Sequence, residues 1–195
     1  KKHIPNIITL GNLLFGTLAT IFAVGGYFEM TALFVSLGVF LDFFDGFFAR
    51  ILKVSGELGK QLDSLADMVT SGVVPGIVLF VLLGNNQQLP YDIHAEFKIS
   101  MGLPLIGLLV TLSACYRLAK FNLDSTQSDA FIGLPTPAAA LLTVTIVKAS
   151  FLVSWIYFTP IYSLSVSLLM IVPIKMLSFK FTSLVLSGNE LRYLT

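Results

Sequence analysis

Four aspartates, Asp42, Asp45, Asp63 and Asp67, lie at helical spacing within segments that are otherwise apolar enough to cross a bilayer. A carboxylate at the centre of a membrane costs about 3 kcal/mol on insertion scales, so such groups face a bundle interior and pair with a partner. Any fold of this chain must therefore gather the four carboxylates around positive charge. One or two divalent cations are the simplest candidate.

The composition is that of an integral membrane protein. Hydrophobic residues make up 55% of the chain and charged residues 12%, whereas soluble domains carry about 25% charged residues. A spanning helix needs about 20 mainly apolar residues, so the chain has room for about six spans. We expect one all-α membrane domain over residues 1–195. The sequence has no basic run interleaved with aromatic residues, which argues against nucleic-acid binding.

Apolar runs separated by turn-forming clusters predict a bundle of six transmembrane helices. Their expected ranges are 7–24, 30–52, 61–83, 98–121, 137–157 and 160–179. Ten basic residues fall at one end of this bundle, and the positive-inside rule assigns that end to the cytoplasm. We therefore expect a multi-pass protein of the cell (inner) membrane, with both termini and the aspartates on the cytoplasmic side. The ten are Lys1, Lys2, Arg50, Lys53, Lys60, Arg117, Lys120, Lys175, Lys180 and Arg192.

Helix geometry places the aspartates in two facing pairs. At about 100° per residue, Asp42 and Asp45 lie about 60° apart, and Asp63 and Asp67 about 40° apart. Carboxylates without nearby His or Cys select hard cations such as Mg²⁺, Mn²⁺ or Ca²⁺, and two such ions would balance four charges.

Two neighbouring residues point to a phosphate ligand. Gly46 follows Asp45 inside a helix, where a glycine favours close approach of a ligand. Arg50 lies one turn further on and offers a planar fork suited to phosphate. The sequence thus predicts a site that handles phosphate with divalent cations.

The spacing D-x2-D-G-x2-A-R-x8-G-x3-D-x3-D resembles the signature of the CDP-alcohol phosphotransferase family. All fixed positions of that signature are filled, by Asp42, Asp45, Gly46, Ala49, Arg50, Gly59, Asp63 and Asp67. The six expected helices also fit the core of that family. The resemblance covers essentially the whole chain.

The resemblance implies a reaction in which a hydroxyl attacks the phosphorus of a CDP-linked alcohol and CMP leaves. It implies that the four aspartates bind two divalent metals and that Asp67 is also the general base. Gly46, Ala49 and Gly59 would let the nucleotide approach the helices, beside Arg50. The P-N-x-x-T segment places Asn6 and Thr9 next to the nucleotide in the family, although an ordinary helix start explains it equally well. A homodimer is a further expectation from the family.

Two later segments bear on the acceptor. The R-L-A-K-F-N run from Arg117 to Asn122 and the G-L-P-T-P-A-A run from Gly133 to Ala139 resemble family members whose acceptor is serine. Arg117 or Lys120 would bind the carboxylate of L-serine and Asn122 its polar groups. The expected substrates are CDP-diacylglycerol and L-serine, and the products phosphatidylserine and CMP.

Other interpretations stay open. Arg117 and Lys120 are equally explained as anchors at the cytoplasmic surface. The same scaffold would suit synthesis of phosphatidylglycerophosphate or phosphatidylinositol phosphate. A divalent-cation transporter would also place aspartates inside a membrane, but it has no use for the Gly46-x-x-Ala49-Arg50 segment.

Overall fold

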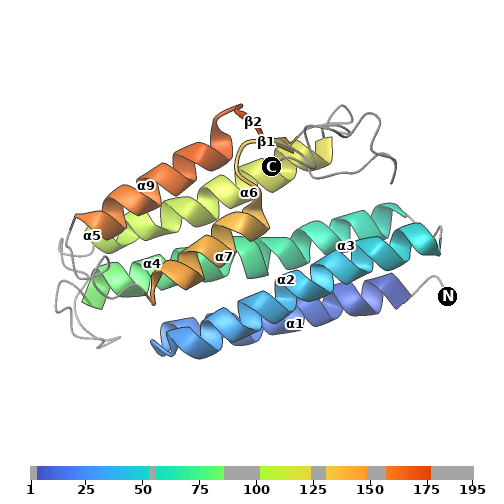
Figure 1. Ribbon diagram of the computed structural model, residues 1–195, viewed down its shortest axis with the longest axis horizontal. Coiled ribbons are helices and arrows are strands. Elements are labelled where there is room, and N and C mark those ends of the chain that lie inside the picture. The colour runs from blue at the N-terminus through green and yellow to red at the C-terminus, as the bar shows by residue number, and fades with distance from the viewer. Residues whose placement is uncertain (1–3, 53–55, 86–101, 124–130, 149–156, 177–195) are drawn as a thin grey trace, which may run out of the picture.

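The computed structural model describes residues 4–52, 56–85, 102–123, 131–148 and 157–176 of the 195-residue chain. Within these ranges the chain forms six helices that run roughly alongside one another (Figure 1). The third and fourth helices each change type along their length. The first two helices are α1 (Ile4–Val24) and α2 (Phe28–Ile51). The third helix consists of α3 (Glu57–Asp67), a π-helical segment (Met68–Val73) and α4 (Val74–Asn85), and the fourth consists of α5 (Gly102–Leu105), a 3₁₀ turn (Ile106–Leu108) and α6 (Leu109–Leu123). The last two helices are α7 (Thr136–Ile146) and α9 (Phe158–Ile171).

Four of these helices are long and apolar enough to cross a membrane, at Pro5–Val24, Phe28–Ala49, Glu57–Gly84 and Gly102–Leu123. Large apolar side chains on their outer faces are exposed, Phe43 by 69% and Ile7 by 65%. This pattern fits lipid contact, as expected for an integral membrane protein. The prediction of six membrane-length helices is confirmed for these four, while α7 and α9 are shorter apolar helices in the described part of the chain.

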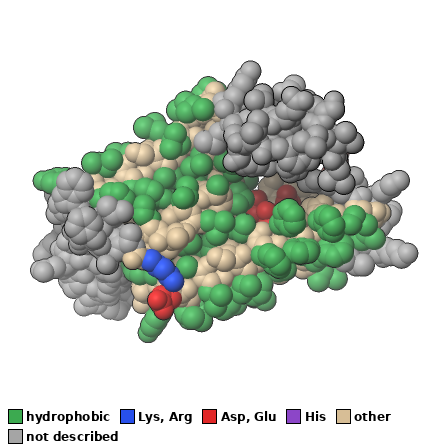
Figure 2. Space-filling model, viewed as in Figure 1, with side chains coloured by type: hydrophobic (Ala, Val, Ile, Leu, Met, Phe, Trp, Pro, Cys, Tyr) green, Lys and Arg blue, Asp and Glu red, His purple; other side chains and the backbone are tan. Residues whose placement is uncertain are grey.

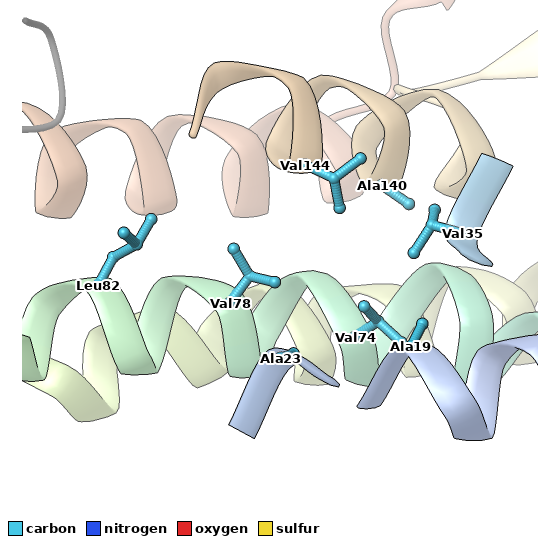
Figure 3. Close-up of a cluster of buried hydrophobic side chains, with 8 residues drawn as sticks. All are labelled: Ala19, Ala23, Val35, Val74, Val78, Leu82, Ala140 and Val144. Carbon is cyan, nitrogen blue, oxygen red and sulfur yellow. The ribbon is translucent and has the colours of Figure 1, made fainter. Parts of the chain in front are cut away.

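The third helix lies at the centre of the bundle. In its most apolar window 61% of residues are buried, compared with 28% in α1 and 17% in α2. Small and branched side chains from α1, α2, α4 and α7 meet on one side of it (Figure 3). Small side chains let helix backbones approach closely, which favours packing inside a membrane. The cluster comprises Ala19, Ala23, Val35, Val74, Val78, Leu82, Ala140 and Val144.

The predicted end of the last helix, at residue 179, was wrong. Helix α9 ends at Ile171, and Val172 is extended with φ −65° and ψ 133°. Pro173 explains this break, because proline disfavours helical dihedrals in the preceding residue and lacks a backbone donor. The chain then forms β2 (Lys175–Met176), which pairs antiparallel with β1 (Phe131–Ile132). This two-residue pairing is the one departure from the predicted all-α class in the described ranges.

Gly133 makes the turn between β1 and α7 possible. Its φ is +75°, and an added Cβ would lie 2.8 Å from the carbonyl oxygen of Met170. Glycine adopts this left-handed conformation without steric cost. The G-L-P-T-P segment thus connects the strand pair to the start of α7.

Apart from the end of the fifth helix, the other predicted boundaries agree to within a few residues where they can be compared. The third helix begins at Glu57 rather than residue 61, after an extended Gly56 with φ −147° and ψ 158°. An acidic residue in the first helical turn is favoured by the helix dipole. The predicted start of the fourth helix, at residue 98, lies outside the described residues. The prediction of one unbroken fifth helix to residue 157 was wrong, because α7 ends at Ile146 and a turn follows at Val147 and Lys148. Residues 149–156 lie outside the described part of the chain.

Candidate functional site

Three of the four aspartates meet between α2 and α3. Asp42, Asp63 and Asp67 offer carboxylate oxygens that all lie within 4.8 Å of one another. Oδ1 of Asp63 is buried and has no hydrogen-bond partner in the described part of the chain. Two carboxylates at this separation repel by about 3–4 kcal/mol at an effective dielectric of 20. An oxygen-only donor set with this much negative charge fits a hard divalent cation.

Asp45 lies beside this cluster, on the side of α1. It is only 5% exposed, and its Oδ2 accepts a hydrogen bond from Thr9 Oγ1. The carbonyl oxygen of Pro5, 3.0 Å from Thr9 Oγ1, shares the single hydrogen of this hydroxyl. Asp42 and Asp45 are three residues apart and so diverge around the axis of α2. The sequence placed all four carboxylates in one group, whereas the structure brings three together and turns the fourth toward Thr9.

A cavity of about 300 Å³ adjoins the cluster and contains Asp45 and Asp63 in its wall. Figure 2 shows acidic side chains in a recess among hydrophobic ones. A Cβ added to Gly46 would meet nothing within 4 Å, and one added to Gly59 would lie 3.4 Å from Oδ1 of Asn6. A ligand can therefore approach the bare helix backbone here. The wall consists of Pro5, Asn6, Thr9, Asp45, Gly46, Ala49, Gly56, Gly59, Lys60 and Asp63.

Seven of these ten wall residues are ones that the sequence assigned to metal or nucleotide binding. Three separate segments of the chain contribute them: the start of α1, the end of α2 and the start of α3. The side chain of Arg50, also predicted to contact the nucleotide, lies outside the described residues.

The three predicted acceptor-binding residues lie on α6, and two of them face the third helix. Arg117 lies close enough to Asp67 for their charges to interact, and its Nε is buried without a hydrogen-bond partner among the described residues. The Asn122 amide donates to Ser64 Oγ at 2.7 Å. Lys60 Nζ donates to the backbone carbonyl of Asn122 at 2.9 Å. Lys120, in contrast, is exposed.

Sequence reasoning missed two polar residues behind the cluster. Asn12 Nδ2 donates to Asp67 Oδ1 at 3.3 Å, and Thr70 Oγ1 donates to Asn12 Oδ1 at 2.8 Å. The spacing of Asn6, Thr9 and Asn12 at every third residue places them on one side of α1 and was an available signal. The π-helical segment that carries Thr70 leaves no such mark in the sequence, although π-bulges are frequent at functional sites.

Comparison with known proteins adds the family context. Residues 2–178 match the sequence model of the family described as CDP-alcohol phosphatidyltransferase. The chain is 37% identical over 147 residues to a CDP-diacylglycerol–serine O-phosphatidyltransferase of Bacillus subtilis, covering 73% of this chain and 74% of that protein. A protein of the same name from Helicobacter pylori strain J99 is 33% identical over 142 residues, covering 72% of this chain and 55% of that protein.

A more distant relative is an archaetidylserine synthase of Methanothermobacter thermautotrophicus. It is 29% identical over 173 residues, covering 86% of this chain and 64% of that protein. The chain thus spans about three quarters of the Bacillus relative and just over half of the Helicobacter one.

Proposed function

The chain belongs to the CDP-alcohol phosphatidyltransferase family, and on that premise we propose that it transfers a phosphatidyl group from CDP-diacylglycerol to L-serine. The serine hydroxyl oxygen forms a bond to the phosphatidyl phosphorus, the bond to the CMP oxygen breaks, and phosphatidylserine and CMP result. The observation that carries this proposal is the cluster of Asp42, Asp63 and Asp67 beside a cavity with bare helix backbone. The printed names of the relatives support serine as the acceptor.

The proposed metal ligands are Asp42, Asp45, Asp63 and Asp67, holding two divalent cations such as Mg²⁺ or Mn²⁺. The carboxylate-only donor set and the buried, unpartnered Oδ1 of Asp63 support this assignment. Bound there, such ions would neutralise the pyrophosphate and stabilise the leaving CMP. Asp45 is included because it lines the same cavity as Asp63.

The cavity is the proposed seat of the CDP moiety. Asn6 and Thr9 supply polar contacts from α1, and Gly46, Ala49 and Gly59 leave room for the phosphates beside the helix backbone. Arg50 is proposed to bind phosphate with its planar fork. Asp67 is proposed as the general base that takes the proton of the attacking hydroxyl.

Arg117 is the proposed anchor for the serine carboxylate. A buried guanidinium nitrogen without a partner costs free energy, so a carboxylate that reaches it gains a charge-assisted hydrogen bond. Asn122 is proposed to bind the polar groups of serine next to Ser64. Lys120 was a further candidate, and its exposure favours a role at the membrane surface instead.

The site is proposed to face the cytoplasm, where serine and CMP diffuse, while the diacylglycerol tails stay in lipid between helices. A homodimer is also proposed. The exposed aromatic face of α2, formed by Phe40, Phe43 and Phe47, offers apolar surface for a second copy or for lipid. Cross-linking in membranes would test the dimer.

Two other functions make different predictions. Synthesis of phosphatidylglycerophosphate or phosphatidylinositol phosphate needs a phosphorylated acceptor, which one buried guanidinium at Arg117 serves less well than a wider basic patch. A divalent-cation transporter predicts cation flux in liposomes without any CMP release. A transferase predicts that the wild-type protein releases CMP and that replacing Asp67 with Asn abolishes this release.

A panel of acceptors tests the proposal. Purified protein with CDP-diacylglycerol and Mg²⁺ would be offered L-serine, glycerol 3-phosphate or inositol phosphate, with and without a chelator. We expect CMP and a labelled lipid with serine alone, and neither product with chelator. A lipid product formed from glycerol 3-phosphate but not from serine would refute the serine assignment.

A further inference from the structure

A buried amide and a buried hydroxyl lie behind Asp67 and have no part in the reaction described above. Asn12 of α1 is 0% exposed and Thr70 of the π-helical segment is 1% exposed. Polar side chains in a helix interface are costly unless their hydrogen-bonding groups are used. Their contacts therefore indicate what the pair does.

The hydrogen bonds define the orientation of the Asn12 amide. An ionised carboxylate only accepts hydrogen bonds, so Asp67 Oδ1 must face the NH₂ group of Asn12, whose Nδ2 lies 3.3 Å away. The carbonyl oxygen of the same amide is then left for the Thr70 hydroxyl, which donates to it at 2.8 Å and lies further, at 3.2 Å, from the backbone carbonyl oxygen of Asn12. A reversed amide would place two acceptors against each other at Asp67.

Two glycines allow the helices to approach this pair closely. A Cβ added to Gly38 of α2 would lie 2.8 Å from Thr70 Cγ2 and 2.9 Å from Asn12 Oδ1. A Cβ added to Gly16 of α1 would lie 3.0 Å from the backbone nitrogen and Cα of Thr70. Three helices thus converge on the buried Asn12–Thr70 pair at contact distance.

The π-helical segment begins with Met68, directly after Asp67, and its closing N–H of Val74 bonds to the carbonyl of Val69, five residues earlier. Such π-helical turns within an α-helix are rare and frequently lie at functional sites. Here the residue that reaches Asn12 is Thr70, which lies within the segment. The π-helical segment thus carries the hydroxyl that bonds Asn12, and Asn12 in turn donates to Asp67.

We propose that Asn12 is a positioning residue for Asp67, and that Thr70 fixes the Asn12 amide in the orientation that this requires. The amide holds Oδ1 of Asp67 and so sets the rotation of the carboxylate, which leaves the second oxygen for the cation and the acceptor hydroxyl. This inference rests on the proposed function, in which Asp67 binds metal and takes the proton of the acceptor.

Thr70→Val and Thr70→Ser separate positioning from packing. Valine keeps the shape and loses the hydroxyl, whereas serine keeps the hydroxyl and loses a methyl group. We expect Thr70→Val to lower kcat about 10-fold or more, as for a lost hydrogen bond in a charged network. The KM for CDP-diacylglycerol should stay within about twofold, because only the reacting geometry changes. Thr70→Ser should retain wild-type kcat.

Mn²⁺ binding to the purified protein, followed by electron paramagnetic resonance, gives a readout that does not need turnover. Loss of a residue that orients a metal ligand weakens metal affinity by about 10-fold or more, so Thr70→Val should bind Mn²⁺ that much more weakly and Thr70→Ser normally. Thr143→Val is the matched control, since Thr143 is equally buried and its hydroxyl bonds Ala139 and Tyr162 far along the chain from the site.

Asn12→Asp is the second test, because it keeps the acceptor for Thr70 and replaces the donor that faces Asp67. It should lower kcat at least as much as Thr70→Val. The inference is overturned if Asn12→Asp or Thr70→Val behaves like wild type, or if Thr70→Ser is as impaired as Thr70→Val, which indicates a packing role. If the wild-type protein releases no CMP with any acceptor, the proposed function fails instead, and the Mn²⁺ data still decide the positioning role.

Discussion

Replacing Asp63 with Asn should stabilise the metal-free protein while abolishing its response to divalent cations. Asp63 faces Asp42 and Asp67 with oxygens within 4.8 Å. Each such pair repels by about 3–4 kcal/mol at an effective dielectric of 20, so removing one charge relieves two repulsive pairs. Water and shared protons relieve part of this repulsion, and we expect a net stabilisation of about 1–3 kcal/mol.

The assay is thermal unfolding in nanodiscs, with chelator and with Mg²⁺. Wild-type protein should unfold at a low temperature in chelator and gain stability with Mg²⁺, because a ligand that binds only the folded state stabilises it. Asp63→Asn should unfold at a higher temperature than wild type in chelator and gain little from Mg²⁺. It should also release no CMP.

Glu57→Gln is the control for charge removal, since Glu57 is exposed in the first turn of α3. It should leave the Mg²⁺ response unchanged and lower the free energy of unfolding in chelator by at most about 1 kcal/mol, through the lost interaction with the helix dipole. Its effect on stability is therefore opposite in sign to that expected for Asp63→Asn. The reasoning is refuted if Asp63→Asn lowers stability in chelator, which would mean that the carboxylates support one another without a cation. It is equally refuted if Asp63→Asn keeps the full Mg²⁺ response.

Three further substitutions test separate parts of the site. Gly46→Leu should fold normally, because a Cβ there meets nothing within 4 Å. It should raise the KM for CDP-diacylglycerol about 10-fold or more by filling the cavity. An unchanged KM would show that the nucleotide does not bind in this cavity. Arg117→Gln should raise the KM for serine about 10-fold or more and leave the KM for CDP-diacylglycerol unchanged. Arg117→Lys should not restore the wild-type KM for serine, since lysine lacks the planar fork. Equal effects on the KM of both substrates would contradict the acceptor role. Ser64→Ala removes the partner of the Asn122 amide, which lowers the free energy of unfolding by about 1 kcal/mol. It should raise the serine KM in initial-rate assays and lower the unfolding temperature by only about 2–4 °C.

The helical architecture followed from the sequence because each span is a long apolar run with clear interruptions. Gly25 and Gly26 end the first helix, and the third begins after Gly56. The last helix was predicted too long because Val172 to Met176 stays apolar apart from Lys175. Only the dihedral consequence of Pro173, together with pairing to a distant strand, ends it at Ile171.

The site was partly predictable for a similar reason. Carboxylates in apolar helices stand out, so the sequence singled out the three aspartates that cluster and the fourth that lines the cavity, together with Gly46 and Gly59 of the cavity wall. Their division into a group of three and a Thr9-bonded Asp45 depends on the position of α1, which spacing along α2 does not encode. Asn12 and Thr70 were missed because an amide and a hydroxyl are ordinary in polar patches of membrane helices, and their significance lies in contacts between helices.

In the proposed reaction, a serine hydroxyl oxygen displaces CMP from the phosphatidyl phosphorus. Serine labelled with ¹⁸O in its side-chain hydroxyl would be incubated with CDP-diacylglycerol, Mg²⁺ and the purified protein, and both products analysed by mass spectrometry. We expect phosphatidylserine to carry the label and CMP to be unlabelled, with one CMP released per lipid formed. Labelled CMP, or CMP release without any labelled lipid, would contradict this reaction.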